Sequence, residues 1–236
     1  RDEKQRACGS RGMNALDVTM HRPAVAGTSH GIARRAMDII LAAAAGMVLA
    51  PLMLLIAVAL FVEGGWPVFF AQTRLGAGAK PFRMYKFRKF KTTADPFGLA
   101  LTMNDDSRMT RVGRFLAATK LDELPQLWNV FTGDMAIVGP RPESLAFADC
   151  FRGGNEAVLQ WKPGLLGPTQ VLFRHEACFY PPSLDPLLFY REVLFPAKAT
   201  IDLAYYPRRT IASDLVWIMR GFRAVFGVSL PPAASG

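Results

Sequence analysis

One long apolar segment constrains this chain more than any other feature of its sequence. Residues 39–62 contain no charged or strongly polar side chain. At about 1.5 Å of rise per residue, a helix of that length can cross a hydrocarbon core of ~30 Å, so a plain transmembrane helix is one interpretation. The whole chain is 51% hydrophobic and 20% charged, which indicates that part of it meets lipid.

Two features favour a helix that bends back toward the face it came from. Pro51 lies close to the middle of the segment, where it removes a backbone hydrogen bond and kinks a helix. Each arm would then reach only about 18 Å, which is too short to span. Basic side chains flank both ends, with Arg34 and Arg35 before and Arg74, Lys80, Arg83, Lys86, Arg88, Lys89 and Lys91 after. Because the positive-inside bias draws both ends to the cytoplasm, we predict a re-entrant hairpin bent at Pro51.

The sequence after the apolar segment predicts a domain of mixed strands and helices. Residues 67–72 read as a short strand, and residues 82–87 alternate apolar and basic side chains at period two. Gly76 and Gly78 lie between these segments and predict a hairpin turn. The fold class that we expect is a helix-rich α+β domain.

Two further segments show helical spacing of their apolar residues. In residues 111–129, Pro125 should start or kink a turn of the helix. Residues 214–226 place apolar side chains on one face, with Arg220 and Arg223 toward the other. That pattern suits an amphipathic helix lying in a membrane interface, and it suits a helix packed on the core equally well.

Charge and cysteine content narrow the class of partner. The net charge of +9 implies an anionic partner, which is nucleic acid, an acidic membrane surface or a phosphorylated substrate. The basic run lacks any nucleic-acid module signature, so we expect no nucleic-acid partner. The three cysteines lack CxxC spacing and indicate neither a disulfide framework nor a zinc site.

The densest group of motifs lies in residues 120–143, and together with flanking motifs it resembles one family. In chain order the motifs are PVFFAQTRLG (67–76), KFR (86–88), DSRMTRVG (106–113), LDELPQLWNV (121–130), GDM (133–135), VGPRP (138–142) and PGLLG (163–167). These motifs and their order resemble the bacterial sugar transferase family, the monotopic phosphoglycosyl transferases. LDELPQ joined to VGPRP is the specific part of this signal.

The resemblance implies an architecture and a location. A flexible tail over residues 1–30 would precede a re-entrant membrane helix hairpin over residues 31–63 and a catalytic domain over residues 64–230. The domain would sit with interfacial amphipathic helices on the cytoplasmic face of the bacterial inner membrane. The implied partners are a UDP-sugar donor, a polyprenyl (undecaprenyl) phosphate acceptor and membrane lipid, and a homodimer is left open.

Asp122 and Glu123 are the residues on which the implied chemistry depends. Adjacent carboxylates cannot share one helix face, so they are expected to have different tasks. An acidic pair is otherwise an ordinary solvated helix start. In the family, the first carboxylate attacks the sugar-bearing phosphate and forms a phosphosugar-aspartyl intermediate with loss of UMP. Glu123, together with Asp122, would hold Mg²⁺, which prefers hard oxygen ligands.

A carboxylate that attacks a pyrophosphate needs cations around it. The candidates for binding substrate phosphate are Arg141, Arg174, Lys86, Arg88 and Arg108. Pro140 and Pro142 restrict the backbone on either side of Arg141 and direct it toward a phosphate or uridine group, so both prolines are assigned to the nucleotide site. For Lys86 and Arg88, contact with lipid headgroups is an equal alternative.

The chain departs from the family pattern at three positions. Ala117 stands where the family usually has arginine, Ala50 precedes Pro51 where serine is frequent, and Leu166 replaces a common threonine. We expect Lys120 or Arg114 to compensate for the missing guanidinium. The departure at position 117 also motivates a second hypothesis, a membrane-attached scaffold or regulator that has lost turnover. A third hypothesis, an aspartyl-phosphate hydrolase, is disfavoured because the chain has no DxDx[TV] loop.

Overall fold

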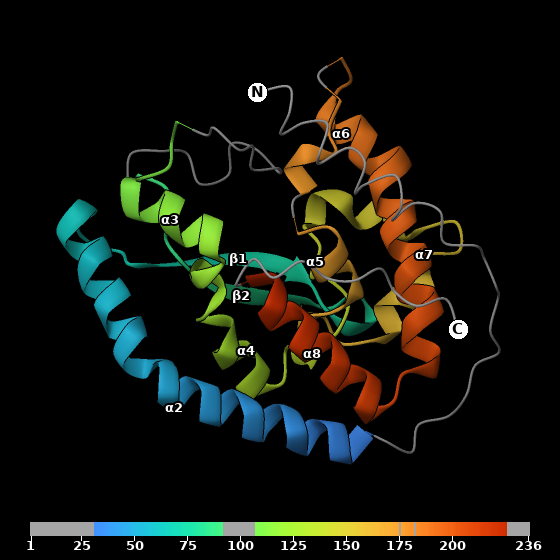
Figure 1. Cartoon of the computed structure of the whole chain (residues 1–236). Helices are drawn as coiled ribbons and strands as arrows, with labels where there is room; N and C mark the ends of the chain where they lie inside the picture. Colours follow the sequence, from blue (N-terminus) through green and yellow to red (C-terminus); the bar gives the residue numbers. More distant parts are fainter. Residues whose placement is uncertain (1–30, 92–106, 175, 182, 226–236) are drawn as a thin grey trace.

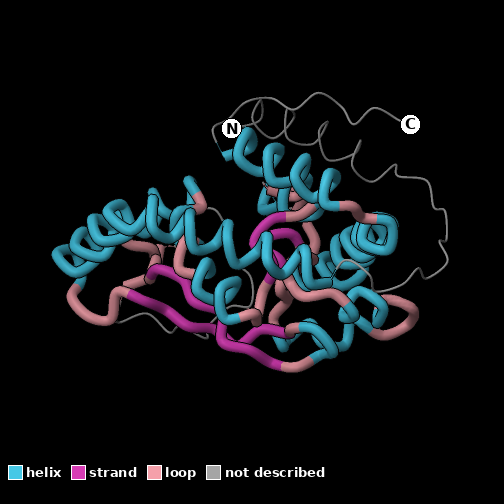
Figure 2. Tube along the Cα trace, turned by 90° about the horizontal axis from the view of Figure 1, so that it is seen from below, coloured by secondary structure: helices cyan, strands magenta, loops and turns pink. Residues whose placement is uncertain are grey.

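The computed structural model describes residues 31–91, 107–174, 176–181 and 183–225, so the predicted tail over residues 1–30 lies outside the described residues. The helices and strands are α2 (Gly31–Gly64), β1 (Phe69–Leu75), β2 (Pro81–Phe87), α3 (Arg111–Thr119), α4 (Gln126–Thr132), β3 (Ala136–Val138), β4 (Gly164–Leu166), α5 (Pro168–Leu172), α6 (Pro186–Phe189), α7 (Phe195–Tyr205) and α8 (Ile211–Val225). Short turns of 3-10 or π type are η1 (Ala77–Ala79), η2 (Leu121–Glu123), η3 (Leu145–Phe151), η4 (Glu156–Gln160), η5 (Glu176–Cys178), η6 (Tyr190–Leu194) and η7 (Tyr206–Arg208). Figures 1 and 2 show two small sheets among many helices, which agrees with the predicted helix-rich α+β class.

The predicted hairpin is confirmed. Strands β1 and β2 pair in antiparallel register from Phe69 opposite Phe87 to Leu75 opposite Pro81. Gly78 in the turn has φ of 65°, in the left-handed region that glycine adopts without strain. The strands begin and end within three residues of the predicted bounds. The small differences lie at strand ends, where the sequence carries a weaker signal than the glycines of the turn do.

A second pair of strands fixes the VGPRP segment. Strands β3 and β4 are parallel, with Ala136 opposite Gly164 and Val138 opposite Leu166. Just beyond β3, the Gly164 amide donates a hydrogen bond of 2.8 Å to the carbonyl of Pro140. A side chain at position 164 would collide with the backbone at position 139, so this close approach requires glycine.

The segment predicted as one helix over residues 111–129 is divided into three elements. Helix α3 ends where Lys120 adopts a left-handed conformation with φ of 63°. The turn η2 follows, and α4 begins after Pro125, as the prediction of a break at this proline requires. Asp122 and Glu123 therefore lie in a tight turn between two helices, not within a regular helix.

Helix α2 is one continuous helix that contains Pro51. Figure 1 shows that it bends partway along its length but does not fold into two antiparallel arms, so the re-entrant hairpin stays a prediction. It is the one helix of the described residues that is long and apolar enough to cross a membrane by length and composition. Large apolar side chains along it are exposed, namely Ile40, Met47, Val48, Leu54, Leu55, Val58, Phe61 and Val62.

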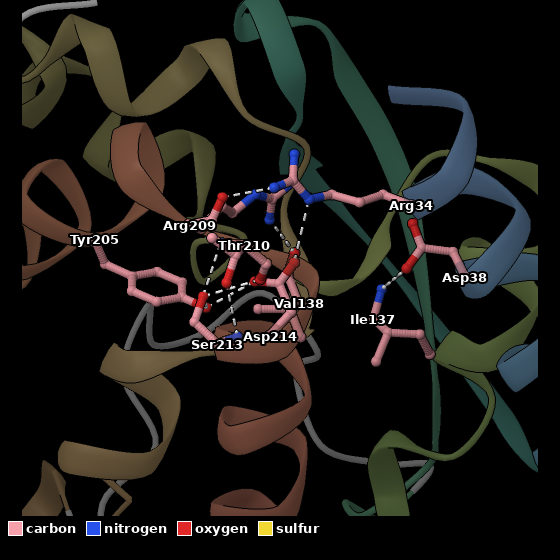
Figure 3. Close-up of polar contacts among 9 residues, drawn as sticks. All are labelled: Arg34, Asp38, Ile137, Val138, Tyr205, Arg209, Thr210, Ser213 and Asp214. Atoms are coloured by element: carbon pink, nitrogen blue, oxygen red, sulfur yellow. Dashed lines mark hydrogen bonds and ion pairs between the residues drawn. The ribbon is translucent and has the colours of Figure 1, made fainter. Parts of the chain in front are cut away.

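Polar contacts attach the start of α2 to the globular domain (Figure 3). Arg34 donates a hydrogen bond of 2.7 Å to the carbonyl of Arg209 and lies 3.3 Å from the carboxylate of Asp214. One turn further along, the Asp38 carboxylate accepts a hydrogen bond of 2.9 Å from the backbone amide of Ile137 in β3. Asp38 and Asp214 are both buried, so salt weakens these contacts less than it would weaken contacts at the surface.

A second set of contacts attaches the end of α2 to the same domain. The Arg88 guanidinium donates hydrogen bonds of 3.0 and 3.1 Å to the carbonyls of Leu60 and Gly64. Glu63 accepts a hydrogen bond of 2.7 Å from the backbone amide of Arg111 at the start of α3. Leu60 is also buried in an apolar cluster with Val68, Phe87 and Leu116. One compact domain therefore holds both ends of the apolar helix.

The last described helix packs on the core, as one of the two interpretations of the C-terminal segment predicts, and its place in a membrane interface stays a prediction. Helix α8 begins at Ile211, earlier than predicted, and residue 226 lies outside the described residues. Ile218 on its inner side packs against the apolar cluster around Val138 and Tyr206. Its outer side exposes Leu215, Val216, Met219 and Phe222. The helix therefore packs on the core with one side and presents an apolar surface with the other.

The contacts of Arg88 lead to a prediction on stability. Arg88→Met should lower the free energy of unfolding by about 1.5–3 kcal/mol, since two hydrogen bonds from a charged donor are lost and the carbonyl of the buried Leu60 is left without its partner. Arg83→Met, on an exposed position of β2, is the matched control and should change stability by less than about 0.5 kcal/mol. Denaturant titrations in detergent, followed by tryptophan fluorescence, measure both. Equal unfolding midpoints for the two variants would contradict the assigned role.

Candidate active site

Asp122 is a buried carboxylate with an unused oxygen. Its side chain lies in the turn η2 and the residue is only 3% exposed. Its Oδ1 atom is buried and accepts no hydrogen bond from the residues that the structure describes. Burial raises the pKa of Asp122, Lys86 opposes that rise and the neighbouring Glu123 adds to it. An oxygen that is buried but not hydrogen-bonded is available to a ligand.

Glu123, the next residue, has the opposite electrostatic character. Its Oε1 atom accepts a hydrogen bond of 2.8 Å from the Lys86 ammonium, and both side chains are largely buried. Burial alone would raise the pKa of Glu123, but the positive charges of Lys86 and Arg141 hold it well below its ordinary value. Adjacent carboxylates whose pKa values are driven apart in this way are suited to different tasks.

Arg141 is fixed opposite this pair by the backbone around it. The Pro140 carbonyl is tied to β4, and Pro142 follows directly. Burial alone would lower the pKa of Arg141, but Glu123 and then Glu176 raise it, so the guanidinium stays charged. With Glu123, Lys120 and Arg174 it lines a cavity of about 100 Å³. The assignment of the two prolines to a nucleotide site stays a prediction.

The structure brings three of the five predicted cations together. Lys86 is paired with Glu123, and Arg141 and Arg174 line the same small cavity as that glutamate. Burial lowers the pKa of Arg174, and the charge of Glu123 works against this decrease. These cations come from β2, from the loop after β3 and from the turn that follows α5, so only the tertiary fold unites them.

Arg88 and Arg108 do not line this cavity. Strand β2 ends at Phe87, so the alternation that would place Arg88 on the same face as Lys86 stops there. The Arg88 guanidinium instead holds the end of α2 by its two carbonyl contacts. Arg108 lies over the ring of Phe90, with 4.8 Å between the guanidinium carbon and the ring centroid. Asp106, which opens the same motif, lies outside the described residues.

Two lysines strengthen the positive field around the acidic pair. Lys120, one of the two residues expected to compensate for Ala117, lines the cavity with Glu123, whereas Arg114 is exposed. Burial lowers the pKa of Lys120. Burial, and then the charge of Lys86, lower the pKa of Lys89 to about 8, and Lys89 also acts on Asp122. Sequence reasoning noted Lys89 as a member of the basic run and missed its place near the carboxylates.

A buried ion pair behind Arg141 was also missed. Lys198 in α7 is 4% exposed and donates a hydrogen bond of 2.6 Å to Glu176, which accepts a second one of 2.8 Å from Tyr180. Both Glu176 and Lys198 line the cavity that contains Arg141. The one signal in the sequence is a lysine among the apolar residues of α7, which does not reveal its distant partner.

Comparison with known proteins identifies the family. The sequence pattern described as "Bacterial sugar transferase" matches residues 29–228, so this chain belongs to the bacterial sugar transferase family, as its motifs predicted. The chain is 43% identical to the UDP-glucose:undecaprenyl-phosphate glucose-1-phosphate transferase of Caulobacter vibrioides over 58% of this chain and 53% of the relative. It is 34% identical to the exopolysaccharide production protein PSS of Rhizobium leguminosarum over 87% of this chain and 97% of the relative.

A further relative shows how much of the longer proteins this chain represents. It is the UDP-N-acetylgalactosamine-undecaprenyl-phosphate N-acetylgalactosaminephosphotransferase of Aeromonas hydrophila, 42% identical over 61% of this chain and 35% of the relative. The chain therefore spans 53% and 35% of the Caulobacter and Aeromonas relatives, and nearly all of the Rhizobium one.

The opposite pKa shifts of the acidic pair predict opposite effects on stability. The pKa of Asp122 is raised above its ordinary value of 3.8, so the folded protein binds this proton more readily than the unfolded chain. The protein therefore loses stability as the pH rises from 3.8 to the higher pKa of the folded state. Asp122→Asn should therefore stabilise the protein at pH 7 by about 0.5–2 kcal/mol. Thermal unfolding in detergent between pH 3.5 and 7.5 measures the gain, which should fade toward the acid end.

Glu123→Gln is the matched comparison. The pKa of Glu123 in the folded protein is held below its ordinary value of 4.5, so the ionised side chain stabilises the fold at pH values above 4.5. This stabilisation is lost as the pH falls from 4.5 toward the lower pKa of the folded state. Glu123→Gln should therefore destabilise the protein at pH 7, and its deficit should also shrink in acid. Two variants that shift stability in the same direction at pH 7 would contradict the electrostatic assignment.

Proposed function

We propose that this protein transfers a sugar-1-phosphate from a UDP-sugar to undecaprenyl phosphate and releases UMP. The observation that carries the proposal is the buried Asp122, whose unpartnered oxygen lies beside Glu123 within a group of cations. The relatives described above, from Caulobacter and Aeromonas, are named for this class of transfer with different sugars, which supports the reaction and leaves the sugar open. The reaction would be the first membrane step in the synthesis of a polysaccharide or glycoconjugate.

In the first step, an oxygen of the Asp122 carboxylate attacks the phosphorus that carries the sugar. A new bond forms between that oxygen and phosphorus, the P–O bond to the α-phosphate breaks, and UMP leaves with the electron pair. A carboxylate without a hydrogen bond on the attacking oxygen keeps its electron pair free for this step. The product is a sugar phosphate attached to Asp122 as a mixed anhydride.

In the second step, a phosphate oxygen of the acceptor attacks the same phosphorus. The bond between phosphorus and the Asp122 oxygen breaks, the carboxylate is restored, and the product is a polyprenyl-diphosphate sugar. The attacking phosphate is already ionised, so no side chain needs to remove a proton. The described site supplies carboxylates for the covalent step and cations for the phosphates.

The cations have separable roles in this scheme. Arg141 and Arg174 line the cavity beside Glu123 and would neutralise the donor pyrophosphate, for which the planar guanidinium offers paired donors. Lys120 lines the same cavity and supplies the charge that Ala117 lacks. Lys86 is held by Glu123 at 2.8 Å, so its ammonium is positioned before a substrate arrives.

The acidic pair fits a single Mg²⁺ that is shared with substrate. In the described residues, no group of three or more His, Cys, Asp or Glu side chains could form a closed metal site. Mg²⁺ is commonly held by one or two carboxylates plus substrate phosphates, and Glu123 with its neighbour Asp122 matches that set. When bound, the ion would withdraw charge from the phosphate oxygens and stabilise the leaving group.

We further propose that α2 enters one leaflet and returns to the same face, so that the domain is monotopic on the cytoplasmic side of the inner membrane. The compact domain holds Arg34 near one end of α2 and Glu63 near the other, which supports a re-entrant path. The exposed apolar sides of α2 and α8 would then face lipid.

The covalent step predicts a specific outcome for Asp122→Asn. Transfer to undecaprenyl phosphate should fall by at least about 10³-fold, because an amide is a poor nucleophile. Labelled sugar phosphate should attach to the wild-type protein without acceptor and not to the variant. Glu123→Gln should also lose activity. The Mg²⁺ concentration that gives half of this variant's maximal rate should be higher than for the wild type. A screen of UDP-sugars for UMP release identifies the substrate, and near-normal turnover of Asp122→Asn would refute the mechanism.

The same assay separates the competing functions. A scaffold gives no UMP release with any UDP-sugar, whereas a hydrolase gives free sugar phosphate in place of the lipid product.

The re-entrant path predicts the sidedness of two positions. Gly31→Cys and Trp66→Cys, each in a chain whose other cysteines are replaced by serine, should react with a membrane-impermeant maleimide from the same side. Both should be labelled in inverted inner-membrane vesicles and protected in intact spheroplasts. Labelling of the two positions from opposite sides would establish a spanning helix instead.

A further inference from the structure

The cavity that contains Arg141 has a second polar end, for which the proposed transfer gives no role. Lys198 of α7, only 4% exposed, donates a hydrogen bond of 2.6 Å to the Oε2 atom of Glu176. Tyr180 donates one of 2.8 Å to the Oε1 atom of the same carboxylate. Glu176 and Lys198 both line the cavity, and neither the covalent step nor the neutralisation of the pyrophosphate requires them. The cavity wall therefore carries an ion pair that the transfer chemistry leaves unexplained.

Stability does not explain why this ion pair is buried. A buried ion pair is often no more stabilising than apolar side chains of similar volume, because both charges lose their hydration. The Lys198 ammonium lies 4.6 Å from the ring centroid of Tyr190 and 5.7 Å from that of Phe173. Both rings belong to an apolar cluster that an apolar side chain at position 198 would also suit. A lysine at this place is therefore better explained by a ligand than by packing.

Glu176 is held as an ionised acceptor that lines the cavity. Its side chain is 23% exposed, whereas that of Lys198 is 6% exposed. Burial alone would raise the pKa of Glu176, but the charges of Lys198 and Arg141 hold it below its ordinary value. An ionised carboxylate accepts about four hydrogen bonds and donates none, and the described residues supply two here. Glu176 is therefore suited to a ligand that donates hydrogen bonds, such as a hydroxyl group, and unsuited to a phosphate.

The neighbouring groups fit a ligand that carries phosphate and hydroxyl groups in one molecule. Glu123 and then Glu176 stabilise the charge of Arg141, so the proposed phosphate site adjoins Glu176. The Lys198 ammonium has three N–H donors and uses one on Glu176. A hydroxyl group can therefore donate to the carboxylate and accept from the ammonium. A UDP-sugar has such groups on both sides of its pyrophosphate, on the ribose and on the transferred sugar.

We infer that Glu176, held by Lys198 and Tyr180, binds hydroxyl groups of the UDP-sugar donor and thereby selects which donors react. The inference rests on the proposed function. The ligand chemistry is a hydroxyl group, or a pair of adjacent ones, and two parts of the donor offer it. A carboxylate is a common partner for a ribose hydroxyl group in nucleotide sites, and the transferred sugar offers hydroxyl groups of the same kind. Glu176 is then a specificity-determining residue, distinct from the cations that bind phosphate.

The test removes the ion pair without leaving a single charge buried. Glu176→Gln combined with Lys198→Met takes away both charges at nearly constant volume. Glu176→Gln alone is the second variant, in case the double variant does not fold. The matched control is Asp149→Asn combined with Arg191→Met, which removes an ion pair outside the cavity lining. The whole chain in vesicles is assayed with the UDP-sugar that supports turnover and with analogues that each lack one hydroxyl group, either of the ribose or of the sugar.

The measured quantity is the ratio of kcat/KM between the complete donor and each analogue. In the wild type, removal of the hydroxyl group that Glu176 binds should lower kcat/KM roughly tenfold to a hundredfold, as expected for one hydrogen bond to a charged group. In the double variant and in Glu176→Gln, the same removal should lower kcat/KM only a few-fold, because a neutral amide accepts more weakly than a carboxylate. The control should reproduce the wild-type ratio.

The analogue that responds identifies the source of the hydroxyl group. If Glu176 binds the ribose, the ribose analogues respond, and UMP, which has no transferred sugar, should inhibit the double variant more weakly than the wild type. If Glu176 binds the transferred sugar, the sugar analogues respond and inhibition by UMP stays at the wild-type level.

An unchanged ratio for every analogue would overturn the inference. This holds whether the variants keep their activity or lose it by the same factor with all donors, and the second case would mean that the ion pair only supports Arg141 or the fold. A wild-type chain that releases no UMP with any UDP-sugar would refute the proposed function instead. The ratios of the Kd values of the same compounds would then still decide the inference.

Discussion

The burial of two adjacent carboxylates is the constraint around which the rest of the structure is organised. Charges removed from water are costly unless opposite charges or a ligand compensate them. Glu123 receives that compensation from Lys86 and Arg141, whereas Asp122 retains an oxygen that accepts no hydrogen bond from the described residues. The cations come from the β1–β2 hairpin and from the loop after β3, so the charge compensation of the acidic pair depends on both small sheets. A site of this kind gives up some stability for reactivity.

The backbone break at Lys120 decides how the carboxylates are presented. If α3 had continued through the LDELPQ motif, Asp122 and Glu123 would project about 100° apart around one helix. The left-handed conformation of Lys120 and the new start at Pro125 place them instead in a tight turn. Lys120 thereby gains a second role, since the same residue that ends α3 also lines the cavity with Glu123.

The apolar helix and the polar site are mechanically connected. Asp38 of α2 accepts a hydrogen bond from Ile137, and Arg209 donates one of 2.8 Å to the carbonyl of Val138 (Figure 3). These contacts hold β3, and the chain reaches Arg141 three residues after that strand ends at Val138. At its other end, α2 is fixed by Arg88 and Glu63. The helix that would meet lipid therefore also fixes the strand that positions the central guanidinium.

The sequence by itself determined the local features and the family. The hairpin was predictable from alternation and glycines, the break near Pro125 from the restrictions on proline, and the site from motifs that combine Asp122, Glu123 and Arg141 within a short stretch. Only the tertiary structure decided which distant charges meet. In the folded protein Arg88 binds the end of α2, Lys198 pairs with Glu176, and an apolar cavity lies beside Leu124. The physical reason is that periodicity and turn chemistry act over a few residues. The pairing of buried charges depends on where separate elements pack, which no single segment encodes.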